Sequence, residues 1–166
     1  GFESQDMQII SLAHKYKKGI MIMVNKWDLI EKDGKTHDKF KKEILEKLGP
    51  LSYIPIIFTS VLQKQRIFQA IETAMKIYEQ RSEKVSTSEL NDVMLKEIER
   101  YPPPALKGKY IKIKYVTQLP TYTPCFAFFC NLPQYIKPPY ERYLENKLRE
   151  HFDFSGVPIK LVFRKK

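Results

Sequence analysis

Two short apolar runs, each ending in a polar turn, constrain the fold of this chain more than any other feature. The first run covers residues 20–24, the second covers residues 53–58, and a segment with helical spacing separates them. Such runs are typical of parallel strands buried on both faces, and a helix between them gives a β-α-β unit. Because the crossover is right-handed, both strands end at the same edge of the sheet, where ligands bind in open α/β sheets. The two polar turns are therefore predicted to lie side by side.

The first turn has the sequence Asn25-Lys26-Trp27-Asp28 and carries groups suited to guanine. The Asp28 carboxylate can accept hydrogen bonds from N1–H and the exocyclic amine of guanine, and adenine offers no such pair of donors. Asn25 can donate and accept, so it can hold the far edge of the ring and brace the loop. The aliphatic part of Lys26 can lie on the base with its ammonium in solvent. A polar strand-to-helix turn without a ligand could have the same short sequence, so the second turn matters.

The second turn, Thr59-Ser60-Val61-Leu62, favours the guanine interpretation. Its position after the second apolar run allows the backbone N–H of Val61 to lie near O6 of a guanine held by the first turn. The predicted base-binding residues are Asn25, Lys26, Asp28, Ser60 and Val61.

The phosphate-binding half of a GTP site is absent from the sequence. No G-x-x-x-x-G-K-[ST] loop is present to surround the phosphates, and no D-x-x-G is present for the metal and the γ-phosphate. Gly34-Lys35-Thr36 lacks the first glycine of such a loop, so we expect Thr36 to cap the following helix instead. We predict no catalytic residue and no metal ligand in this chain, and we expect it to be inactive toward GTP by itself.

Composition is typical of a globular chain of one or two small domains, with 43% hydrophobic residues among 166. No signal sequence and no apolar run of about 18 residues is present, so we expect a cytoplasmic protein without membrane association. Cys125 and Cys130 are too few for a metal or disulfide framework and are expected to pack in a core.

Helical spacing in the first half predicts helices over residues 5–16, 36–48 and 66–80. Gly49 and Pro50 should end the second of these. A polar linker over residues 81–85 follows the third helix, and we place the domain boundary there. The predicted domains are residues 1–84 and 85–166.

The second half reads α-β-β-α-β. A capping box from Ser86 to Glu89 opens its first helix, which the prolines at 102–104 end. The strands that follow are predicted over residues 110–116, 125–130 and 159–164. The second helix of this half is predicted over residues 140–152. This order suits a KH-like sheet, although no G-x-x-G loop is present to hold an RNA backbone.

Basic residues alternate with apolar ones in the outer strands of this predicted sheet. Residues 85–166 hold 14 Lys and Arg against 8 Asp and Glu, within a chain of net charge +10, and such a surface favours phosphate backbones. The predicted RNA contacts on the outward face are Lys112, Lys114, Lys160 and Arg164. The polar side of the last helix, with Arg142 and Arg149, is the alternative contact surface.

Further family-like strings accompany the two turns. They cover residues 1–6, 86–91, 102–104, 140–146 and 156–161. On these residues the chain resembles the C-terminal part of the EngA (Der) family of bacterial tandem GTPases. One departure is Val61, where alanine is more usual.

The resemblance implies a partial P-loop-NTPase-type G domain, lacking its N-terminal half, followed by an α+β KH-like domain. It also implies GTP or GDP as the cofactor, with the Mg²⁺ ligands outside this chain, and action on the large ribosomal subunit or its rRNA. Two interpretations stay open: part of a GTP-hydrolysing ribosome biogenesis factor, or a nucleotide-independent RNA- or protein-binding module. Because the first-half strands would be left with open edges, we also expect self-association of the chain.

Overall fold

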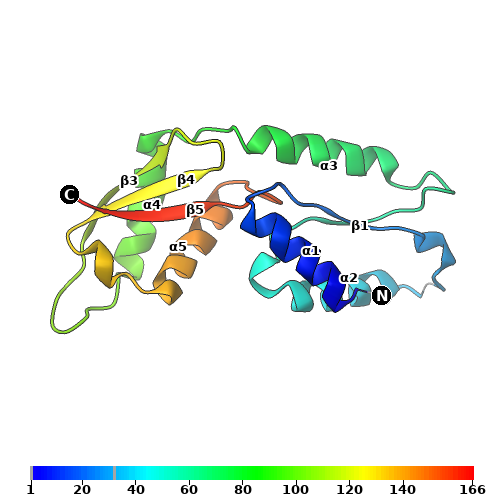
Figure 1. The fold of residues 1–166 in the computed structure, drawn as a ribbon, viewed down its shortest axis with the longest axis horizontal. Coiled ribbons are helices and arrows are strands. Elements are labelled where there is room, and N and C mark those ends of the chain that lie inside the picture. The colour runs from blue at the N-terminus through cyan, green and yellow to red at the C-terminus, as the bar shows by residue number, and fades with distance from the viewer. Residues whose placement is uncertain (1, 32) are drawn as a thin grey trace. The chain divides into compact units, whose positions relative to one another are not determined.

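The two predicted strands of the first half pair with each other in the computed structural model, which describes residues 2–31 and 33–166 (Figure 1). β1 (Ile22–Val24) and β2 (Ile56–Phe58) are parallel, with Met23 opposite Ile57. Between them lie the short helix η1 (Trp27–Leu29), the helix α2 (Thr36–Leu48) and the short helix η2 (Gly49–Leu51). This is the predicted β-α-β unit, and it brings the ends of both strands to one edge.

The helices of the first half begin and end at local signals. α1 (Ser4–Lys15) starts with a capping box in which the backbone N–H of Glu3 donates to the Asp6 carboxylate at 2.8 Å. α2 starts after Asp33, whose carboxylate accepts from the hydroxyl of Thr36 at 2.7 Å, and it has the predicted bounds. α3 (Ile67–Gln80) is the third helix. The core of this half is made by Ile10, Ile20, Trp27, Ile44, Leu48, Ile54 and Phe58.

The chain divides into two units that do not follow the sequence order completely. The first unit contains the chain up to Gln80 together with Phe154–Pro158, and the second contains Arg81–Asp153 and Ile159–Lys166. The predicted boundary after residue 84 falls four residues beyond Gln80. The segment Phe154–Pro158, which the sequence analysis placed in the second domain, packs in the first unit.

Gly156 explains how this segment packs. Its N–H donates to the carbonyl of Tyr53 at 3.0 Å, and its carbonyl accepts from the N–H of Ile20 at 2.8 Å. The glycine has φ +70°, and a Cβ atom there would lie 2.5 Å from the carbonyl oxygen of Ile20. A side chain is therefore excluded both by the backbone conformation and by contact with main chain. Because Ile20 and Tyr53 bond to this segment, β1 and β2 are shorter than the apolar runs that predicted them.

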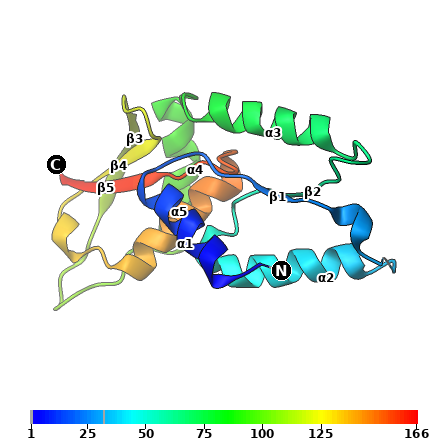
Figure 2. The same cartoon turned by 45° about the vertical axis from the view of Figure 1, so that its right-hand side comes forward.

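The second unit has the predicted α-β-β-α-β order. α4 (Thr87–Arg100) precedes β3 (Ile113–Leu119) and β4 (Cys125–Cys130), and the short helix η3 (Pro133–Tyr135) and α5 (Pro138–His151) precede β5 (Lys160–Lys165). The strand order is β3-β4-β5, with an antiparallel first pair and a parallel second pair. Both helices lie on one side of the sheet (Figures 1 and 2). The predicted fold class, a partial α/β G domain followed by an α+β KH-like domain, is confirmed.

The first strand of this sheet begins three residues later than predicted. The side chain of Asn131 accepts from the N–H of Lys112 at 2.8 Å and donates to the carbonyl of Tyr110 at 3.0 Å, so it takes the place of a strand partner there. The register then shifts between Ile113 and Tyr115. A bulge of this kind depends on the partner strand and leaves no simple mark in the alternation of residues.

Two tyrosines of α5 complete the carboxyl end of α4. The hydroxyl of Tyr143 donates to the carbonyl of Glu97, and the hydroxyl of Tyr140 donates to the carbonyl of Tyr101, both at 2.9 Å. The carbonyl of Glu97 also accepts from the N–H of Tyr101, so Tyr143 adds a second donor there, while Tyr140 gives a donor to the carbonyl of the C-cap residue. Burial raises the pKa of Tyr140, whose hydroxyl stays a donor at physiological pH.

Both cysteines lie in β4, buried and unpaired with each other, which confirms the expected packing role. Burial raises the pKa of each thiol, so both are poor nucleophiles.

Candidate functional site

The two polar turns are joined by main-chain hydrogen bonds directly beyond β1 and β2. The N–H of Thr59 donates to the carbonyl of Val24 at 2.8 Å, and the N–H of Trp27 donates to the carbonyl of Thr59 at 3.0 Å. The parallel ladder therefore continues into the turns. Their relative position is set by backbone pairing and not by surface contacts alone.

Asn25 connects the first turn to the second through its side chain. Its Oδ1 accepts from the N–H of Val61 at 3.3 Å, so Asn25 braces the second turn. The Val61 N–H that was predicted to lie near guanine O6 therefore bonds to Asn25 in this structure. Ser60 is buried, its Oγ accepts from the N–H of Gln63 at 3.2 Å, and its backbone pairs with Gln65. The structure thus brings Asn25, Ser60 and Val61 together, with Val61 exposed.

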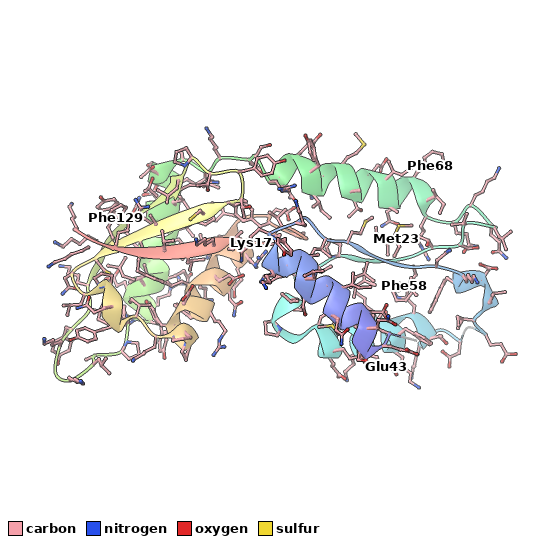
Figure 3. All side chains as sticks on the ribbon, viewed as in Figure 1. Lys17, Met23, Glu43, Phe58, Phe68 and Phe129 are labelled. Atoms are coloured by element: carbon pink, nitrogen blue, oxygen red, sulfur yellow. The ribbon has the colours of Figure 1, made fainter. Side chains whose placement is uncertain are left out.

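Trp27 anchors the first turn. Its ring is 4% exposed and packs against Phe58, with ring centroids 4.5 Å apart, and against Phe40 at 5.5 Å (Figure 3 labels Phe58). The neighbours of this buried ring are accessible: Lys26 is exposed in a left-handed conformation with φ +58°, and Asp28 is half-buried at the start of η1. A fixed aromatic between two accessible polar side chains holds the loop in one shape, which a base-reading loop requires.

A groove of about 770 Å³ borders this loop, but its charges do not suit phosphate. It is lined mainly by apolar residues of α1, β1 and α2, together with three carboxylates and one lysine. Those charged residues are Glu3, Asp6, Glu43 and Lys47. Because carboxylates repel phosphate oxygens, the residues of this groove do not fit the triphosphate of a nucleotide. The turns offer donors and acceptors for a base, and the described residues around them do not offer a phosphate cradle.

The four predicted basic contacts are all exposed but form two pairs. Lys160 and Arg164 are exposed on β5, and the residues on either side of Lys160, Ile159 and Leu161, are buried. Lys112 and Lys114 lie at the start of β3, beside a groove of about 530 Å³ that α4 also lines. Since β3 and β5 are the two outer strands, with β4 between them, the pairs occupy opposite edges of the sheet.

Residues 84–164 match the family model described as the KH-domain-like region of EngA bacterial GTPase enzymes, C-terminal. All 166 residues align with the GTPase Der of Amoebophilus asiaticus at 64% identity and with that of Cytophaga hutchinsonii at 63%. The GTPase Der of Christiangramia forsetii is 57% identical over the same length. The chain belongs to the EngA (Der) family. It spans 38% of the length of each of these relatives.

Arg66 also supports the site, although the sequence analysis did not predict it. The guanidinium of Arg66 donates to the carbonyl of Phe58 at 2.9 Å and so supports the second turn from behind. Arg66 and Lys64 both have positive φ, at +56° and +54°. A non-glycine residue in this conformation has no sequence signal, so the supporting role of Arg66 becomes visible only in the structure.

In the KH-like unit, the acidic residues and the strands occupy different parts of the sequence. Residues 101–140 contain five lysines and no Asp or Glu, and residues 154–166 contain four basic residues and no acid. All three strands lie within these two stretches, so the acids of the unit are confined to its helices and linkers. The sheet is therefore positively charged without internal compensation.

In the described part of the chain, no helix is long and apolar enough to cross a membrane. The same residues contain no group of three or more His, Cys, Asp or Glu side chains placed to hold a metal ion.

Proposed function

We propose that this chain is part of a GTP-binding, GTP-hydrolysing ribosome biogenesis factor that acts on the large ribosomal subunit in the cytoplasm. The observation that carries the proposal is the hydrogen-bonded union of the two turns, in which Thr59 bonds to Val24 and Trp27, and Val61 bonds to Asn25. Two turns held this way present one continuous surface to a planar ligand.

In this proposal each residue has a distinct role. Asp28 accepts from the guanine N1–H and amine, Lys26 covers the base with its aliphatic part, and Asn25 fixes the second turn. Ser60 shapes that turn, and Val61 lies near O6 while its N–H donates to Asn25. GTP or GDP is the cofactor, and the phosphate loop, Mg²⁺ ligands and water-positioning groups lie in parts of the complete protein outside this chain. The chain alone should show no GTP hydrolysis and at most weak guanine-nucleotide binding.

The role of Asn25 is tested by GDP affinity in the complete protein. Asn25→Ala removes the hydrogen bond that joins the two turns, which should weaken GDP binding by about 0.5–1.5 kcal/mol, or roughly 2- to 13-fold. Gln63→Ala, an exposed change directly after the second turn, is the control and should bind GDP as the parent does. Equal GDP affinity of Asn25→Ala and the parent would argue against a base site at these turns.

We propose further that the KH-like unit contacts rRNA through its basic sheet. This proposal is supported by the three strands, which carry basic residues and no Asp or Glu. A surface with positive charge and no acids attracts a phosphate backbone. Each lost phosphate contact should reduce the magnitude of the salt slope of log affinity by roughly 0.7 to 0.9. Lys112→Glu with Lys114→Glu, and separately Lys160→Glu with Arg164→Glu, should each flatten the slope by more than one unit.

The helix alternative is tested in the same titration. Arg149 is a poor contact because its side chain is 13% exposed and pairs with Glu145 at 3.2 Å, so Arg142→Glu is the informative change on α5. A loss confined to Arg142→Glu would move the contact from the sheet to the helix. Strong RNA binding by the chain without nucleotide would favour the second candidate, a nucleotide-independent binding module, for which the acid-free sheet is the specific support.

A further inference from the structure

Tyr115 of β3 and Phe129 of β4 stack on each other across the two strands. Their ring centroids are 4.4 Å apart and their planes differ by 13°. The two residues are directly paired in the register, and Arg164 of β5 is the next partner of Phe129 on the far side. One row across the sheet therefore reads tyrosine, phenylalanine and arginine, with Phe129 labelled in Figure 3.

This row lies on the side of the sheet opposite the helices. The next row contains Val116 and Phe128, and both are completely buried, as expected for side chains that face α4 and α5. Since successive residues of a strand point to opposite faces, Tyr115 and Phe129 point away from those helices. Both rings are half-buried in the described structure, and Arg164 is exposed.

The charged residues of the three strands, and Lys166 beside Tyr115, are all basic. The ammonium of Lys166 lies 4.8 Å from the centroid of the Tyr115 ring, within the range of a cation–π contact. Lys160 and Lys165 lie on the same outer strand as Arg164, and none of the three strands contains an acid. The spacing between neighbouring strands puts Arg164 roughly 10 Å from the backbone of Tyr115, so cations border the aromatic pair at short range.

We propose that Tyr115 and Phe129 form a stacking platform for unpaired bases of single-stranded RNA, with Arg164 and Lys166 binding the adjacent phosphates. The inference rests on the proposed rRNA contact and specifies its ligand. Aromatic side chains bind bases through their ring faces, and a base inside a duplex has no free face to offer. A sheet that carried only phosphate contacts would need the cations but not the aromatic pair on its outer side.

The test is the affinity of the 166-residue chain for a ten-nucleotide oligouridine and for an RNA duplex of the same length. Tyr115→Leu with Phe129→Leu should weaken oligouridine binding by about 10-fold or more, because stacking of a base on an aromatic ring typically contributes that much to affinity. Duplex affinity and the salt slope should stay unchanged, because the phosphate contacts remain. Tyr110→Leu removes a tyrosine that is 82% exposed in the same unit and should have no effect.

Two further measurements keep the outcome decisive if the double variant folds poorly. Tyr115→Phe and Phe129→Tyr retain both rings and should bind oligouridine like the parent. In the unaltered chain, the ring protons of Tyr115 and Phe129 should shift upfield as oligouridine is added. Unshifted ring protons, or equal loss of single-stranded and duplex binding, would overturn the platform.

The result also separates this inference from the proposal on which it rests. Duplex or folded rRNA binding with a normal salt slope, but no oligouridine binding, would overturn the stacking platform alone. Binding to neither RNA would overturn the rRNA contact as well. Neither result bears on the guanine site.

Discussion

Among single residues, Glu97 on α4 shows most clearly how surroundings set the behaviour of a charge. Its side chain is only 7% exposed, the guanidinium of Arg100 lies 3.0 Å from Oε1, and the imidazole of His151 lies 3.3 Å from the same oxygen. Burial by itself would raise the pKa of Glu97, but the hydrogen bond to His151 and the charges of Arg100 and Lys147 together lower it. The folded unit therefore favours the ionised carboxylate.

This arrangement predicts acid sensitivity of the KH-like unit. A carboxyl whose pKa is lowered by folding stabilises the fold above its ordinary value of 4.5, and that stabilisation is lost as the pH falls through the lower folded-state pKa. Glu97→Gln should lower the melting temperature at neutral pH and reduce its dependence on acid. Thermal unfolding by circular dichroism between pH 7 and 3 measures both effects.

The control is Glu99→Gln, an exposed change on the same helix. It should follow the acid dependence of the parent. If Glu97→Gln follows the parent curve as well, Glu97 contributes nothing to the acid sensitivity.

Gly156 gives a second prediction for a single residue. A methyl group there meets the carbonyl of Ile20 at 2.5 Å and the side chain of Ile77 at 2.7 Å, in a backbone conformation with φ +70°. Gly156→Ala should destabilise the first unit by about 1–3 kcal/mol. Urea unfolding followed by Trp27, the only tryptophan, reports on this unit directly. Gly34→Ala, where an added Cβ meets nothing within 4 Å, should be close to neutral. Equal unfolding midpoints for the two variants would contradict the close packing of Phe154–Pro158.

At the scale of elements, Asn91 joins α4 to the edge of β3. Its Nδ2 donates to the carbonyl of Val116 and its Oδ1 accepts from the N–H of the same residue, both at 2.9 Å. The side-chain amide thus takes the place of a neighbouring strand at an otherwise open edge. This contact holds the first helix of the unit in register with its sheet.

Removing this contact should loosen β3. Asn91→Leu leaves two main-chain groups of Val116 without partners, which should cost about 1–3 kcal/mol for a buried group and increase amide exchange at Val116 most. Asn91→Asp keeps the acceptor and should lose only part of the protection. Unchanged exchange at Val116 in Asn91→Leu would show that β3 does not depend on α4 in this way.

Elements with local signals were predictable from the sequence, and elements that depend on distant contacts were not. The bounds of α2 were predicted correctly, but Thr36 does not cap it: Thr36 is its first residue and its hydroxyl bonds to Asp33. Ser86 does accept from the N–H of Glu89 at the start of α4, as predicted. The start of β3 was predicted wrongly because Asn131, far along the chain, pairs with residues 110–112.

The same distinction applies to the candidate site. The two turns were predicted to be adjacent because strand order alone requires it. Three features have no local pattern: the packing of Gly156 against Ile20, the support of Phe58 by Arg66, and the stacking of Tyr115 on Phe129. Each joins residues through tertiary structure, so only the fold reveals them.

At the scale of the whole molecule, the first unit exposes large apolar side chains on its helices. On α3, Phe68 is 80% exposed and Met75 is 58% exposed, and Ile9 and Leu12 of α1 are exposed as well. Phe68, Ile71 and Met75 follow the spacing of one face of α3, and soluble monomers rarely expose an apolar stripe of this kind. We therefore predict that the isolated chain self-associates at micromolar concentrations.

Sedimentation velocity over a range of concentrations tests self-association. Phe68→Gln with Met75→Gln removes two exposed apolar residues seven apart, on one side of α3, and should shift the chain toward monomer. Lys17→Gln, a change just beyond the carboxyl end of α1, is a control that should sediment like the parent. A parent chain that sediments as a monomer at all concentrations would contradict the prediction.

If the two joined turns bind guanine, Asp28 sets the base preference of the complete protein. Asp28→Asn replaces the carboxylate that would accept from N1–H and the amine of guanine with an amide that can donate to the extra carbonyl of xanthine. Competition binding of GDP against xanthosine diphosphate measures the change, with Asp38→Asn on the exposed surface of α2 as the control. Asp28→Asn should move the preference from guanine toward xanthine, and Asp38→Asn should leave it unchanged. An unaltered preference for GDP in Asp28→Asn would contradict this role of Asp28.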